Sequence, residues 1–343
     1  MRKIVYAGLL ALAAGGSPAA TQAQDAETFY RGKTVQLYIG FGPGGSYDLY
    51  ARLLARHIGK HIPGNPEVVP FNQEGAGSML LANWLYNVAP KDGTVIATIS
   101  RAVPFFPLID KDASAAQFEA SKFTWIGSAN DEVSTCVAWT ASGIESVDDL
   151  KTKGMILGGD GPTADGEQFA RLMNGVLGTK INIVTGYGGS GDLNVAMERG
   201  EIQGRCGWSW SSVVASHSDW LESGQIKVLM QMGSKPHPDL KDVPTLSEAI
   251  TDPEDRQIVD IVLARQPLGR PFLAPPGIPE DRAEVLRKAF MDTMADPDFL
   301  AEAKKVKLEV VPLSGEDVQA VVERAYAAAT ENVKIRTRDM LSP

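Results

Sequence analysis

The sequence predicts an α/β protein of two lobes, each built on a mostly parallel sheet, with two chain crossings between them serving as a hinge. Three observations predict this class. The chain has 343 residues, more than one compact core comfortably accommodates. Strand and helix patterns alternate along the chain. The alternation starts afresh after Trp125, so we expect a second sheet.

In the first part of the chain, runs of β-forming residues predict strands at 34–39, 67–71 and 95–99. Apolar residues recur at helical spacing between these runs, near 50–61 and 80–85. The alternation of strand and helix favours parallel pairing, with helices covering the faces of the sheet.

A second set of strands and helices follows, and Ser146 resembles an N-cap that opens one of these helices. The expected strands are 136–139, 155–157, 181–184, 202–208 and 228–232. Near the end we expect a strand with a sharp turn at 271–277, a long helix at 280–294, and one final helix running from 314 through Val333. Lobe I is therefore predicted to comprise 24–130 and 262–343, and lobe II 131–261.

The start of the chain predicts secretion. Arg2 and Lys3 precede an apolar run, Ile4 to Ala14, and small residues follow it. This order is typical of a signal peptide, here 1–23, cleaved after Ala23. The alternative is a membrane anchor, but the run is about half of the roughly 20 residues that a spanning helix needs.

The net charge limits the classes of partner. It is -9 for the whole chain, and removing the two positive charges of 1–23 makes it about -11. An acidic chain without a basic stripe argues against nucleic acid. An anionic ligand would have to be held by local dipoles or by single basic residues.

Cys136 and Cys206 are the two cysteines of the chain. In an oxidising compartment they suggest one disulfide, if their strand-like segments lie side by side. The alternative is two buried free thiols. Neither cysteine has a metal or redox motif around it.

A glycine-rich segment, Gly40 to Ser46, lies between a predicted strand and a predicted helix. It satisfies the dinucleotide pattern G-x-G-x-x-G, but Pro43 lacks the N–H that a phosphate would need, and secretion removes the chain from the cytosolic nucleotide pool. A turn with no ligand is a further alternative. We favour an anion cradle, because free N–H groups at a helix start attract anions. The design recurs at Gly75–Ser78, Asp160–Thr163 and Gly188–Gly191.

Several segments resemble one known family. Phe41 to Arg52 is similar to the "PGGS-D--AR" signature of the Bug receptors, the TctC-like substrate-binding subunits of tripartite tricarboxylate transporters. Further similarities follow in order along the chain: Asn72–Gly77 to "N-pGAGG", Ala89–Thr94 to "A-PDGYT", Val243–Glu248 to "DVPT--E", and Phe272–Gly277 to "--APAGTP".

The resemblance implies the type II periplasmic binding protein fold, a Venus flytrap that closes on a small carboxylate and presents it to the membrane subunits of a transporter. It implies ligand contacts in lobe I at Phe41, Gly44, Gly45, Ser46, Gly75, Ala76 and Ser100. For the closing lobe it implies Asp160, Thr163, Tyr187, Gly189 and Trp208. The carboxylate expected is a dicarboxylate, a tricarboxylate, or an aromatic or alicyclic acid.

The chain also departs from the family pattern. Ser78 follows Gly-Ala-Gly where the family usually has Gly or Asn, and it is added to the candidate ligand contacts. The common "FDN" run is replaced by Arg205 to Trp210, whose two tryptophans either stack on a ring-bearing ligand or belong to the core. Arg101 and Arg205 are candidate counter-charges, each with a surface ion pair as the alternative.

Catalysis is not expected. His57 and His61 are four residues apart on one predicted helix, but no glutamate completes H-E-x-x-H. Neither a nucleophile with its base nor a pair of carboxylates is singled out by spacing. We expect a periplasmic monomer without a cofactor. The alternatives are a secreted NAD-type oxidoreductase that uses the Gly40–Ser46 loop, and a ligand-sensing partner of a two-component system.

Overall fold

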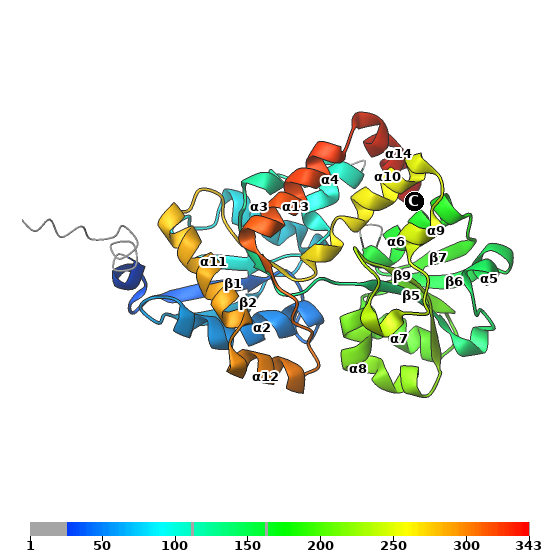
Figure 1. Cartoon of the computed structure of the whole chain (residues 1–343), viewed down its shortest axis with the longest axis horizontal. Helices are drawn as coiled ribbons and strands as arrows, with labels where there is room; N and C mark the ends of the chain where they lie inside the picture. The colour runs from blue at the N-terminus through cyan, green and yellow to red at the C-terminus, as the bar shows by residue number, and fades with distance from the viewer. Residues whose placement is uncertain (1–25, 111–112, 162–163, 343) are drawn as a thin grey trace, which may run out of the picture.

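The computed structural model describes residues 26–110, 113–161 and 164–342. The predicted signal peptide, 1–23, and the predicted contact Thr163 therefore lie outside the described residues. Two lobes lie side by side (Figure 1), each built on one sheet.

The strands and helices alternate through most of the chain. The strands are β1 (Thr34–Ile39), β2 (Glu67–Asn72), β3 (Val95–Thr98), β4 (Thr124–Ser128), β5 (Ser134–Trp139), β6 (Met155–Gly159), β7 (Ile181–Thr185), β8 (Gly204–Ser209), β9 (Ile226–Met232), β10 (Pro271–Ala274) and β11 (Leu313–Ser314). The helices are α2 (Ser46–Ile58), α3 (Met79–Asn87), α4 (Phe106–Ile109), α5 (Val147–Thr152), α6 (Asp165–Leu177), α7 (Ser190–Glu198), α8 (Trp210–Glu222), α9 (Leu246–Ala249), α10 (Pro253–Leu263), α11 (Glu280–Met294), α12 (Pro297–Lys305), α13 (Gly315–Ala328) and α14 (Glu331–Leu341).

The sheet of the first lobe has six strands in the order β11-β4-β10-β3-β1-β2. Strands β2 and β3 pair with β1 in parallel, as the alternating pattern predicts. The returning strand β10 is antiparallel to both β3 and β4, and β11 is antiparallel to β4. The sheet is therefore mixed, which corrects the predicted mostly parallel arrangement.

The second sheet has the order β7-β6-β8-β5-β9. It is also mixed: β6 pairs in parallel with β7 and β8, whereas β5 is antiparallel to β8 and β9. Every antiparallel pair of the described strands contains β4, β5 or β10, strands that lie directly before or after a crossing between the lobes. The two-lobed α/β class is confirmed.

The local periodicity of the sequence is reflected in which side chains are buried. In β1, Val35, Leu37 and Ile39 are fully buried while the residues between them are more exposed. The predicted helix face of α2 is buried through Leu53, Leu54 and Ile58. Burying each such side chain stabilises the fold by about 1.5–3 kcal/mol, so alternation sets the orientation of each element.

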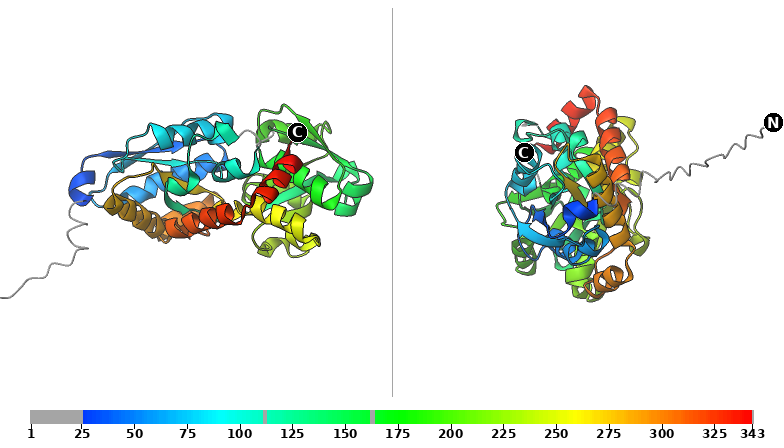
Figure 2. Two further views of the ribbon diagram at one scale, coloured as in Figure 1. Left: turned by 90° about the horizontal axis from the view of Figure 1, so that it is seen from above. Right: turned by 90° about the vertical axis from the view of Figure 1, so that its left-hand side faces the viewer.

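Three segments lie over the junction between the lobes. The chain crosses from β4 to β5 and returns from β9 to β10, as predicted. The C-terminal helix α14 contacts α4 in the first lobe and α6 in the second, and the view from above places it across the junction (Figure 2). Arg338 donates to the carbonyl of Pro107 and Arg171 donates to that of Ser342, at 2.9 and 3.2 Å. The bounds of the lobes stay a prediction.

The end of the chain differs from its predicted form. The single helix expected from 314 through Val333 is two helices, α13 and α14, separated at Ala329 and Thr330. Thr330 caps the second of them by accepting a hydrogen bond from the amide of Val333. Among the described helices, none combines the length and the apolar character that crossing a bilayer requires.

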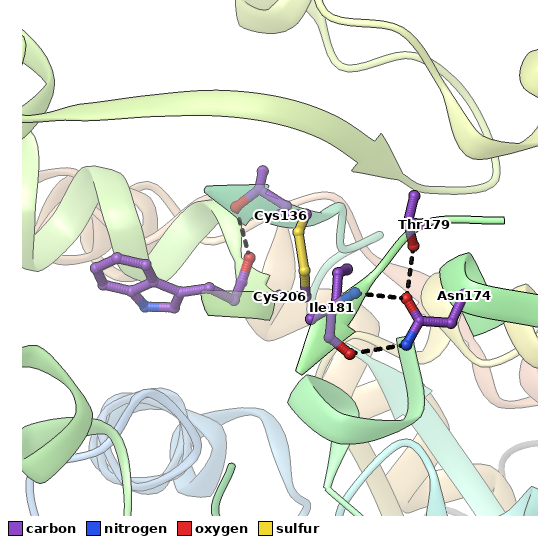
Figure 3. Close-up of a disulfide and its surroundings, with 7 residues drawn as sticks. Cys136, Asn174, Thr179, Ile181 and Cys206 are labelled. Atoms are coloured by element: carbon purple, nitrogen blue, oxygen red, sulfur yellow. Dashed lines mark hydrogen bonds between the residues drawn. A yellow bond between two sulfur atoms is a disulfide. The ribbon is translucent and has the colours of Figure 1, made fainter. Parts of the chain in front are cut away.

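The predicted disulfide is present. Cys136 on β5 and Cys206 on β8 are bridged across a separation of 70 residues, so the alternative of two free thiols is wrong. Figure 3 shows the bridge beside Asn174, whose side-chain amide exchanges hydrogen bonds with the backbone of Ile181 at 2.9 Å each way. Asn174 also accepts from Thr179 at 2.7 Å. The bridge fixes β8, and Asn174 fixes the connection from α6 to β7.

Candidate functional site

A cleft of about 460 Å³ lies between the lobes, at the ends of β1, β2, β6 and β8. Ligands of α/β proteins commonly bind at the carboxyl ends of parallel strands. Eight of the predicted contacts line this cleft: Phe41, Gly45, Ser46, Gly75, Asp160, Gly189, Arg205 and Trp208. Ala76 and Ser100 line an adjoining chamber, whereas Gly44, Ser78, Arg101 and Tyr187 line neither.

The loop before α2 is held by the helix that it opens. The Asp48 carboxylate accepts a hydrogen bond from the Gly44 amide at 2.9 Å and also binds Arg52 and Asn72. Burial opposes ionisation of Asp48, but these hydrogen bonds prevail and lower its pKa. The Gly44 amide is therefore engaged within the protein.

The loop before α7 repeats this construction in the other lobe. The Asp192 carboxylate accepts from the Gly188 amide at 3.0 Å, and Gly-Gly-Ser-Gly-Asp-Leu at 188–193 parallels Gly-Gly-Ser-Tyr-Asp-Leu at 44–49. Gly45 and Gly189, the N-caps of α2 and α7, have no side-chain capping bond. Both helix ends line the cleft. Two positive ends of helix dipoles thus face one space, which favours an anion there.

The loop before α3 has an unusual backbone. Ala76 and Ser78 both have positive φ, 47° and 71°, and such residues cost about 1–3 kcal/mol each. Ser78 is fully buried, and its hydroxyl accepts from the Ser100 amide at 2.7 Å. Ser78 therefore ties this loop to the end of β3 from behind the cleft. That position differs from the ligand contact we expected of it.

Arg101 bridges the lobes. Its guanidinium contacts the Asp165 carboxylate at 2.6 Å and the Ser134 hydroxyl at 2.9 Å, with the side chain 3% exposed. Burial opposes the charge, but Asp165 outweighs this and raises the pKa of Arg101. Burial likewise opposes ionisation of Asp165, yet Arg265 and Arg101 lower its pKa. Arg101 is a cross-lobe ion pair rather than a free counter-charge.

Arg205 has a different environment. It donates to the Ser190 hydroxyl at 3.0 Å and to the Asn194 amide oxygen at 2.5 Å, and its guanidinium lies 4.3 Å from the centre of the Trp208 ring. Its Nε is buried without a partner, and no described carboxylate forms an ion pair with it. Burial lowers the pKa of Arg205 to about 10, with Asp160 opposing the shift. It is therefore a buried cation that faces the cleft.

Asp160 is the acidic residue whose charge acts on Arg205. Burial raises the pKa of its carboxyl, and Arg205 acts in the opposite direction. Trp208 is 5% exposed and packs in an apolar cluster that also contains Trp210 and Tyr187. Trp208 thus borders the cleft while belonging to the core, and its stacking on a ring-bearing ligand stays a prediction.

Sequence reasoning missed several residues at this junction. Tyr47 stacks on Phe41 with ring centres 4.3 Å apart. Arg270 donates to the Ser46 hydroxyl at 2.8 Å and lies 3.3 Å from Glu132. The signal that could have pointed to this arrangement is the matching loop sequence at 44–49 and 188–193. The arginines themselves are far from these loops in the sequence and carry no motif.

The two histidines considered as metal ligands contact carboxylates of α12 and of its N-cap residue. His57 lies 2.7 Å from Glu302, and His61 lies 2.8 Å from Asp296. Within the described residues, no group of three or more His, Cys, Asp or Glu side chains is arranged to hold a metal ion. These histidines therefore contribute to packing between α2 and α12.

Comparison with protein families and with curated proteins gives a likeness over part of the chain. No protein-family model matches it. A Cupriavidus necator protein described as "UPF0065 protein in gbd 5'region" is 35% identical over 108 residues, which is 32% of this chain and 32% of the relative. The chain therefore matches about a third of that relative's length.

Solved structures extend the likeness to the whole fold. The periplasmic binding protein BugD gives a TM-score of 0.67 at 20% identity, over 91% of this chain and 98% of BugD. A Rhodopseudomonas palustris protein solved with adipate gives 0.68 at 20% identity, over 90% and 98%. MatC of the same organism, with bound malate, gives 0.63 at 20% identity, over 91% and 99%. The predicted resemblance is confirmed, and this chain has the two-lobed fold of the Bug and TctC-like periplasmic binding proteins.

Proposed function

We propose that the chain is a periplasmic solute-binding protein that captures a small carboxylate between its lobes. The observation that carries the proposal is Arg205, a buried guanidinium in the cleft without an ion-pair partner among the described residues. An unpaired buried charge is costly. A ligand carboxylate would supply the missing counter-charge, and the N-terminal ends of α2 and α7 would favour the same anion.

Two further observations support this function. Structural neighbours were solved with adipate and with malate, and the start of the chain predicts secretion. The proposed contacts are those predicted residues that line the cleft or its side chamber: Phe41, Gly45, Ser46, Gly75, Ala76, Ser100, Asp160, Gly189, Arg205 and Trp208. The protein would act as a monomer without a cofactor and deliver its ligand to the membrane subunits of a tripartite tricarboxylate-type transporter.

The proposed mechanism is closure. The acid first binds the loops of lobe I, residues 24–130 and 262–343, through backbone N–H groups near Gly45. Lobe II, residues 131–261, then brings Arg205 and the start of α7 onto the carboxylate. Closure excludes water, which strengthens these charge-assisted hydrogen bonds. The segments between β4 and β5 and between β9 and β10 would bend as the hinge.

Arg205→Gln tests this function by calorimetric titration with dicarboxylates, tricarboxylates, aliphatic acids and aromatic acids. We expect the wild-type protein to bind at least one acid saturably, and the variant to bind it about 10- to 150-fold more weakly. That range corresponds to one hydrogen bond to a charged group, about 1.5–3 kcal/mol.

The matched control is Arg199→Gln, because the Arg199 side chain is 68% exposed and lies outside the cleft. It should leave the affinity unchanged. Absence of saturable binding to any acid, or turnover of one, would contradict the proposed function.

A further inference from the structure

The cleft continues into a second chamber of about 380 Å³. The two spaces share Phe41, Tyr47 and Gly77 of the first lobe and Asp160 and Asp165 of the second. A single small molecule can therefore occupy both, with one end in the cleft and the other in the chamber.

The walls of the chamber are mostly apolar. They come from the start of α3, the segment after β3, and α4, and the second lobe adds the start of α6. The apolar wall residues are Met79, Ala102, Val103, Phe106, Ile109 and Ala115. The stacked rings of Phe41 and Tyr47 stand where the two spaces meet. These surfaces suit an alkyl chain or an aromatic ring.

The charges of the two spaces differ. The cleft contains Arg205 together with the acids Glu74, Asp160 and Asp165, whereas the described residues that line the chamber include no Lys, Arg or His. Among the described residues that line the chamber, the charged side chains are those of Asp160 and Asp165. Arg101 and Arg265 compensate Asp165, but neither lines the chamber.

This contrast separates two kinds of acid. A second carboxylate placed in the chamber would lie near two acidic side chains and lose its water without gaining a cation, which is costly. A methylene group moved there from water gains about 0.8 kcal/mol. The chamber therefore favours an apolar tail over a second charged group.

Resting on the proposed function, we infer that the ligand is a monocarboxylic acid with an apolar tail. Its carboxylate binds Arg205 and the ends of α2 and α7. Its tail passes the rings of Phe41 and Tyr47 and fills the chamber.

The inference is tested by calorimetry on the secreted chain with acetate, butyrate, hexanoate and octanoate, and with succinate, adipate and suberate. We expect the affinity for the monocarboxylates to rise about fourfold for each methylene that enters the chamber, from 0.8 kcal/mol per group. Butyrate, hexanoate and octanoate should also each bind more tightly than the dicarboxylate of equal carbon number.

Ala102→Leu reduces the chamber from its wall. It should weaken octanoate binding tenfold or more while leaving butyrate binding unchanged. Ala115→Leu does the same from an exposed wall position and serves if the first variant folds poorly. Ala301→Leu, on the exposed face of α12, is the matched control and should bind every acid as the wild type does.

The outcomes separate this inference from the function on which it rests. Binding that requires Arg205 but is tightest for dicarboxylates, or is indifferent to tail length and to Ala102→Leu, overturns the apolar-tail ligand and leaves the solute-binding function standing. Absence of binding to every acid overturns both.

Discussion

The loops before α2 and α7 are built alike, but the arginines that bind them have different partners. In each, an aspartate of the first helical turn accepts from a glycine amide, and the first serine of the helix accepts from a buried arginine, Arg270 on Ser46 and Arg205 on Ser190. Arg270 has Glu132 as a counter-charge at 3.3 Å, both side chains being 1% exposed. Arg205 has no such partner among the described residues. The arginine of one loop is thus neutralised within the protein, and the arginine of the other keeps an uncompensated charge.

The largest expected effect comes from removing the counter-charge of the neutralised loop. Glu132→Gln leaves Arg270 buried without its carboxylate, and it disturbs the hydrogen bonds that Glu132 accepts from Ser211. We expect a loss of about 3–5 kcal/mol in the free energy of unfolding, measured by urea denaturation. Arg205→Gln should cost less than about 1 kcal/mol, because it removes an unpaired charge.

Asp148→Asn is the control for this comparison, since its side chain is 87% exposed and forms an ion pair with Lys151. Exposed pairs contribute about 0–1 kcal/mol. If Glu132→Gln were no more harmful than this control, the two arginines would not differ in the way their partners indicate.

The second prediction concerns the strand that carries Arg205. Cys206 follows Arg205 on β8 and bridges to β5. Replacing both cysteines by alanine should lower the free energy of unfolding by about 2–4 kcal/mol, because the bridge limits the unfolded chain over 70 residues. It should also weaken acid binding, since Arg205 loses a rigid support.

The measurement is denaturation together with titration of the best-bound acid. Dithiothreitol should reproduce the change in the wild type and have no effect on the double variant. Full affinity in the reduced protein would show that strand pairing alone holds Arg205.

Much of the fold could be predicted because its signals are local. The helix Glu280–Met294 and the strand Thr34–Ile39 have the predicted bounds, since each depends on apolar spacing within one short segment. Helix α8 was missed. Its segment is rich in serine and β-branched residues, which have weak helix propensity, and packing of Trp210 and Val213 in the core compensates for this.

The site was predictable only in part, because its geometry depends on distant residues. Arg101 and Arg205 are equivalent candidates in the sequence. They are distinguished by Asp165, which lies 64 residues from Arg101 and on the other lobe. Ser78 was expected to face the ligand because it follows a glycine-rich turn, but the backbone of that turn directs its hydroxyl to Ser100. Neither the contact between Arg101 and Asp165 nor the direction of the Ser78 hydroxyl can be inferred from spacing along the chain.

The smallest predicted effect concerns what positions Arg205. The Asn194 amide oxygen accepts from Arg205 at 2.5 Å, and its nitrogen lies 2.7 Å from Nε2 of His217. Helix α8 is distorted at His217, with φ −140°, and the His217 ring packs on Trp208 and Trp220. A neutral His217 accepts from Asn194, which fixes the amide with its oxygen toward Arg205.

Acidification should therefore weaken acid binding. Burial lowers the pKa of His217, Arg205 lowers it further, and Asp219 and Glu198 oppose these effects. His217 is thus neutral at pH 7 and takes up a proton only at a pH below about 6.5, the ordinary pKa of histidine. The protonated ring donates from Nε2, so the Asn194 amide must rotate and lose its bond to Arg205.

One hydrogen bond of about 1 kcal/mol predicts about a fivefold weaker affinity between pH 7 and pH 5, measured by calorimetry with the best-bound acid. His217→Gln keeps a side-chain acceptor and removes the titration, so it should abolish this decrease. Protonation of Asp160, whose pKa is raised, would strengthen anion binding. A rise in wild-type affinity on acidification would therefore mean that Asp160, and not the hydrogen bond that Asn194 accepts from Arg205, controls Arg205.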